Sequence, residues 1–192
     1  HLTQIRYLLA QGAEYSKTNL LEMASMYADR PHVVDFVEET YAAEPNPPER
    51  WAVYRDELYN AAQHGREKAF MRLLLYSRKD FDPVNSPMPP EFLHAAILGN
   101  SLAIIEKVWE LGSRQLVDQC LCNDFGRREG GGKWVQWLLD HGADPLACLA
   151  SMKTDFCEGI KKGDPSVVPL LVRLREMLQS QPDLLETLAK LD

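Results

Sequence analysis

Four cysteines are the side chains of this sequence best suited to binding a metal ion. Cys120 and Cys122 form a C-x-C pair, Cys148 and Cys157 follow, and His141 lies between the two pairs. Zinc sites use cysteine and histidine, but this spacing is not that of a known zinc finger, and side chains two residues apart on a helix point in different directions. Cysteines without a metal are commonly buried in a core. We therefore expect buried, inert thiols, and no metal or other cofactor.

The histidines and one glycine-rich segment are the remaining candidates for catalysis or phosphate binding. The five histidines stand at positions 1, 32, 64, 94 and 141, and none lies in a nucleophile motif such as G-x-S-x-G. The segment "GRREGGGK" at 126–133 lacks the G-x-x-x-x-G-K-[ST] spacing of a phosphate-binding loop and follows no predicted strand. We interpret it as part of a loop between helices at 123–133. The sequence therefore predicts a protein that is not an enzyme.

The four tryptophans could form an aromatic cage for a cation. Trp134 and Trp137 lie three residues apart on a predicted helix, so we expect them to pack in the core or at its edge. Trp51 follows a proline-rich segment, and no pattern around it predicts a role. Core packing is the interpretation that the spacing favours.

Composition and charge narrow the class of protein and of partner. The chain of 192 residues is 45% hydrophobic, which is enough to bury a sizeable core. With 28 acidic and 21 basic residues its formal charge is -7, which argues against nucleic acid as a partner. No apolar run approaches the roughly 20 residues of a membrane-spanning helix, so we expect no membrane insertion. Free cysteines are typical of a reducing compartment, which favours an intracellular location, cytoplasmic or nuclear.

The elements that must position any functional residue are short helices. In "ELYNAAQHGREKAFMRLLLYS" at 57–77, small and apolar residues recur at helical spacing on both sides of Gly65. The pattern predicts two short antiparallel helices. Alanines on the first helix let neighbouring helices approach closely, and the leucines on the second supply buried apolar area.

The same arrangement recurs along the chain, in the segments 20–41, 92–112 and 155–174. Their first small residues stand at 24, 61, 95 and 159, which gives spacings of 37, 34 and 64 residues, the last being two units of 32. The segments "LLAQGAEYS" at 8–16 and "WVQWLLDHGADPL" at 134–146 match the end of the same unit. A repeat of about 33 residues with these helix pairs resembles the ankyrin-repeat family.

The resemblance covers residues 2 to about 178 and implies an all-α fold, a solenoid of stacked antiparallel helix pairs with about five to six divergent repeats and irregular loops. A single array would span 1–180, followed by a C-terminal capping helix at 181–192. A partial first repeat would occupy 1–17. The further repeats would lie near 18–50, 51–86, 87–114, 115–150 and 151–180. No repeat keeps the family's T-P-L-H turn intact, and proline-rich connections at 41–50 and 77–91 depart from the consensus.

The repeat register also predicts which residues are buried. These are the small and apolar residues that face the neighbouring helices: Leu58, Ala61, Leu73, Leu74, Phe92, Ala95, Ile105, Leu138 and Leu139.

The resemblance implies a monomeric protein-protein interaction module, a scaffold or adaptor, that binds a protein or peptide in a concave groove. The outward positions of the first helices would line that groove. They are Met23, Met26, Tyr27, Asn60, Gln63, His64, His94, Ile97, Leu98, Lys161 and Lys162. The alternative for the apolar members is cover by the proline-rich loops. Since the chain begins with His1 rather than Met, an alternative function is that of a regulatory or targeting ankyrin domain of a larger multidomain enzyme or channel.

Overall fold

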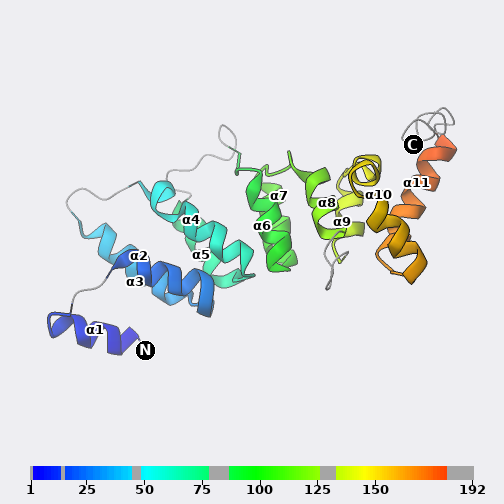
Figure 1. Ribbon diagram of the computed structural model, residues 1–192. Coiled ribbons are helices and arrows are strands. Elements are labelled where there is room, and N and C mark those ends of the chain that lie inside the picture. The colour runs from blue at the N-terminus through cyan, green and yellow to red at the C-terminus, as the bar shows by residue number, and fades with distance from the viewer. Residues whose placement is uncertain (1, 14–15, 45–48, 78–86, 126–132, 181–192) are drawn as a thin grey trace. The chain divides into compact units, whose positions relative to one another are not determined.

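The computed structural model describes residues 2–13, 16–44, 49–77, 87–125 and 133–180 (Figure 1). The regular structure of these residues is entirely helical. The chain forms two compact units, His1–Arg114 and Gln115–Asp192, which we call the first and second units. The all-α class predicted from the sequence is thus confirmed.

The first unit contains three helix pairs in succession. Its elements are α1 (Leu2–Ala10), α2 (Lys17–Glu22), the π-helix η1 (Met23–Ala28), α3 (Pro31–Ala42), α4 (Arg50–Gln63), α5 (Glu67–Ser77), α6 (Glu91–Gly99) and α7 (Leu102–Glu110). The first helices of the pairs, α2 with η1, then α4, then α6, pack against one another in turn. The second helices, α3, α5 and α7, do the same, so the pairs stack in two layers.

The second unit contains two such pairs. They are α8 (Val117–Phe125) with α9 (Val135–Asp140), and α10 (Pro145–Lys162) with α11 (Val167–Ser180). Here too the first helices, α8 and α10, pack together, as do the second helices, α9 and α11. Asp144 caps α10 by accepting a hydrogen bond from the amide of Leu146 at 2.9 Å, with Pro145 in the first turn.

Helices α4 and α6 meet backbone to backbone at two glycines. A Cβ atom added to Gly99 would lie 1.9 Å from the carbonyl oxygen of Ala62, and one added to Gly65 would lie 2.3 Å from the carbonyl oxygen of Gly99. Gly65 also has a left-handed backbone, with φ of +62°, which turns the chain from α4 into α5. Glycine is therefore required at this contact on steric grounds.

The core follows the sequence pattern closely. Every residue that the repeat register places inside is buried: Leu58, Ala61, Leu73, Leu74, Phe92, Ala95, Ile105, Leu138 and Leu139. Leu58 and Ala61 belong to α4 and Phe92 and Ala95 to α6, two helices that pack against each other, and the remaining residues lie on the second helices of their pairs. This part of the prediction is confirmed.

Two structural features bear on the predicted repeat organisation, which stays a prediction. The boundary at 150/151 falls inside the continuous helix α10, because residues 146–158 contain neither proline nor glycine to end it. The compact division at 114/115 separates two units where the sequence predicted one array. The predicted capping helix at 181–192, and most of the loop at 123–133, lie outside the described residues. No helix in the described ranges has the length and apolar composition needed to cross a membrane.

Candidate protein-interaction surface

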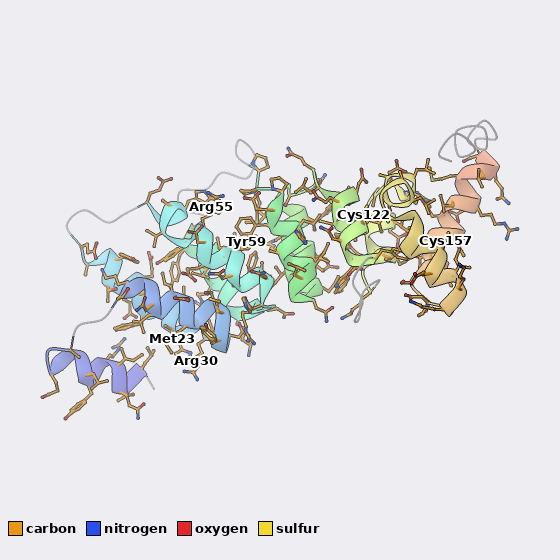
Figure 2. All side chains as sticks on the ribbon, in the orientation of Figure 1. Met23, Arg30, Arg55, Tyr59, Cys122 and Cys157 are labelled. Atoms are coloured by element: carbon orange, nitrogen blue, oxygen red, sulfur yellow. The ribbon has the colours of Figure 1, made fainter. Side chains whose placement is uncertain are left out.

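The most exposed apolar side chains among the predicted groove residues belong to η1. Met23 is 52% exposed and Tyr27 is 67% exposed, while Met26 between them is half-buried. Met23 is labelled at the surface of the first unit in Figure 2. Gln63 and His64, at the end of α4, are half-buried and exposed respectively. Because η1 packs against α4, these five residues form one candidate site, which we call the first-helix surface.

The π-helical form of η1 is fixed at its C-terminal end by contacts to the next helix pair. The helix ends at Asp29, whose backbone is left-handed with φ of 43°. The Asp29 carboxylate accepts a hydrogen bond from the amide of Ala69 at 2.9 Å, and Arg66 Nε donates to the carbonyl of Met26 at 3.1 Å. Both contacts reach the first turns of α5 and so hold Met26 and Tyr27 beside the end of α4. π-Helical turns are frequent at functional sites.

A buried carboxylate lies beneath this surface. Ser25 of η1, which is fully buried, donates a hydrogen bond to the Glu57 carboxylate of α4. The side chain of Asn60 donates to the same group. Burial raises the pKa of Glu57 above its ordinary value, helped by the charges of Glu22 and Asp56 and opposed by the two hydrogen bonds. The side chain of Asn60 is thus engaged inside the protein, whereas the sequence had assigned it to a partner.

A second buried carboxylate, that of Glu38, connects the same two helix pairs through α3, which belongs to the layer of second helices. Tyr54 of α4 donates a hydrogen bond to Glu38 of α3 at 2.7 Å, and both side chains are buried. Sequence reasoning missed Glu38 and Glu57 as structural residues. A signal was present, because Tyr54, Glu57 and Ala61 recur at helical spacing and so place a carboxylate on a buried stripe of α4.

Glu57→Gln is expected to gain stability over the wild type as the pH rises. Burial raises the folded-state pKa of Glu57 above its ordinary value, so the contribution of Glu57 to stability is full at low pH and declines as the pH rises through the folded-state pKa. Glutamine keeps an acceptor for Ser25 but never ionises. We expect thermal melts between about pH 4 and pH 8 to favour the variant by on the order of 1 kcal/mol at the upper end.

The control for this experiment is Glu106→Gln, which removes an exposed carboxylate from α7. Its difference from the wild type should change little over the same pH range. If the difference in stability between Glu57→Gln and the wild type were also independent of pH, folding would not disfavour the ionised form of Glu57.

The predicted groove is wrong at Ile97. This side chain is only 2% exposed, and Leu93, one helical turn earlier, is also buried. Together with the buried stripe at Phe92 and Ala95, this leaves α6 buried over more than half of its circumference. His94 and Leu98 are half-buried. Ile97 is therefore a core residue and cannot be an apolar contact for a partner.

The remaining predicted residues, Lys161 and Lys162, are exposed at the end of α10 in the second unit. Lys162 pairs with Glu158 one turn earlier on the same helix, at 2.9 Å. An exposed pair of this kind contributes little to stability. The first-helix surface is accordingly defined on the first unit alone.

None of the four cysteines forms a disulfide, and their environments differ. Cys120 and Cys148 are buried, and burial raises the pKa of each thiol to about 12. Cys122 is half-buried. Cys157 is exposed, contrary to the expectation of a buried thiol, because it lies on the solvent side of the last turns of α10. Within the described part of the chain, no three histidine, cysteine, aspartate or glutamate side chains are grouped as metal ligands would be.

The aromatic residues pack in separate places. Trp51 lies against Phe92 with ring centroids 6.3 Å apart, which assigns this side chain to the contact between α4 and α6. Trp134 is buried, and Trp137 stacks on His141 at 3.7 Å. The expectation that Trp134 and Trp137 pack in the core or at its edge is confirmed.

Comparison of the sequence with protein-family models gives no match, and comparisons with curated proteins and with solved structures give none either. Function is therefore inferred from the geometry of the first unit.

Proposed function

We propose that this chain is a divergent ankyrin-repeat protein-interaction module, a scaffold or adaptor that binds a protein or peptide partner and performs no chemistry. The observation that carries the proposal is the exposure of Met23 and Tyr27 on the first helix of a stacked helix pair. The recurring two-layer packing of the pairs supports the family assignment, since each unit repeats the same contacts between first helices and between second helices.

The chemistry of the first-helix surface suits a partner with apolar side chains. Methionine is flexible and polarisable, and tyrosine combines apolar area with a hydroxyl, so both are favoured at protein-binding surfaces. His64 donates from Nδ1 to the carbonyl of Asn60 at 2.9 Å, which fixes its ring at the edge of the surface. Gln63 beside it offers an amide for hydrogen bonds that orient a bound chain.

The replacement of Met23 and Tyr27 together by serine is expected to weaken partner binding by about tenfold or more, because apolar anchors contribute most of the affinity of such surfaces. Peptides would be selected from a random display library on the wild-type protein. Their affinities for the wild type and the double variant would then be measured by calorimetry.

A matched control exists on the second helix α5, where Met71 is 36% exposed and Leu75 is 56% exposed. The double variant Met71→Ser and Leu75→Ser removes a similar apolar area from the opposite layer. Selected peptides should bind it as they bind the wild type. Both variants should have the melting temperature of the wild type. The proposed surface would be refuted if the affinity of the peptides fell on replacement of Met71 and Leu75, or if it changed in neither double variant.

A further inference from the structure

The thiols of Cys122 and Cys148 are in contact across two helices of the second unit. Cys122 belongs to α8 and Cys148 to α10, and these helices pack against each other. A side-chain hydrogen bond joins the two sulfur groups. Neither cysteine forms a disulfide in this structure. Two thiols that share a hydrogen bond between two packed helices form a candidate site for oxidation.

The two thiols differ in their access to solvent. Cys122 is half-buried and Cys148 is buried, so Cys122 is the more accessible residue of the two. Burial, together with its neighbour Cys122, raises the pKa of Cys148 to about 12 and keeps it protonated. Because thiolates are the reactive species, Cys148 is protected from direct oxidation. The arrangement therefore combines an accessible thiol with a protected one beside it.

We propose that Cys122 and Cys148 are a redox modification site, at which hydrogen peroxide produces a reversible disulfide between α8 and α10. The sulfur of Cys122, as its thiolate, attacks one peroxide oxygen, the O–O bond breaks, and a sulfenic acid and hydroxide form. Cys148 then gives up its proton, its sulfur attacks the sulfur of Cys122, and the S–O bond breaks with release of water. In total, two thiols are oxidised and one peroxide is reduced to two waters.

The bond would be made between two sulfur atoms that already share a hydrogen bond. They need to approach to about 2.05 Å, a movement that side-chain rotation and a small shift of the packed helices can supply. The disulfide would join the first helices of the two pairs in the second unit. The first-helix surface belongs to the first unit, so the two proposals concern residues of different units.

The test is peroxide treatment of the full chain, followed by alkylation of the remaining thiols under denaturing conditions and mass spectrometry. Trypsin cleavage after Arg114 and Arg127 releases Cys120 and Cys122 in one peptide, and cleavage after Lys133 and Lys153 releases Cys148 in another. We expect a loss of about 2 Da, a cross-linked pair of these peptides, and recovery of both with dithiothreitol.

Single serine variants assign the bond. Cys122→Ser and Cys148→Ser should abolish the cross-link, while Cys120→Ser and Cys157→Ser should retain it. Cys157, which is exposed, serves as a control for general reactivity, because it should be oxidised without a partner in the same molecule. Accumulation of Cys122 as sulfinic acid with Cys148 still free, or a cross-link that survives in Cys122→Ser, would overturn the proposal.

Discussion

Ala61→Arg is expected to unfold the first unit at room temperature. Ala61 has no exposed surface and lies on α4, the helix that packs against η1, α5 and α6. The arginine side chain would find no space, and its charge would be buried without a partner. We expect a loss of more than about 4 kcal/mol, which is a large share of the stability of a small unit.

The measurement is thermal unfolding followed by circular dichroism. Ala103→Arg, at an exposed position of α7, is the matched control and should melt within a few degrees of the wild type. An Ala61→Arg variant with an unchanged melting temperature would mean that the repeat register is incorrect and that α4 does not present Ala61 to its neighbours.

Gly99→Ala is the second change with a large expected effect. Helix propensity alone favours alanine over glycine, so the substitution should stabilise a free helix. Here, however, the new methyl carbon would lie 1.9 Å from the Ala62 carbonyl oxygen and 2.6 Å from the Gly65 nitrogen. Both are backbone atoms, which cannot rotate away. The two helix ends must separate, and we expect a loss of about 3 kcal/mol in chemical denaturation.

Gly142→Ala provides the comparison. Gly142 has φ of +93°, but a Cβ atom there would meet no atom within 4 Å. Substitution of Gly142 therefore introduces backbone strain without a steric clash. We expect it to lower the free energy of unfolding by about 1 kcal/mol. Should Gly99→Ala lose no more stability than Gly142→Ala, the close approach of α4 and α6 would not exist in solution.

The sequence predicted the helix pairs and their small contact residues because these depend on local spacing. Ala61 and Ala95 recur at one register, and a stripe of apolar residues marks the face that each helix buries. The burial of Ile97 could not be predicted in this way. Periodicity within α6 identifies one buried face, but it does not show that the neighbouring stripe through Leu93 and Ile97 is covered as well.

The candidate site was predicted only in part, for a related reason. Met23, Tyr27 and His64 are exposed at the outward positions that the repeat register gives them, and their role in binding stays a prediction. The pairing of Glu57 with Ser25 depends on two helices that are distant in the sequence. The length of α10 was missed because the resemblance suggested a turn, whereas residues 146–158 contain neither proline nor glycine to end the helix.

The division into two compact units also distributes the natural fluorophores of the protein. Trp51 and Trp109 belong to the first unit, whereas Trp134 and Trp137 belong to the second. Tryptophan emission therefore reports on both units, and phenylalanine substitution of either pair would leave a signal from one alone. The fluorescence unfolding curves of these two variants can then be compared. Coincident curves indicate that both units unfold in one transition, whereas separate midpoints give the stability of each unit on its own.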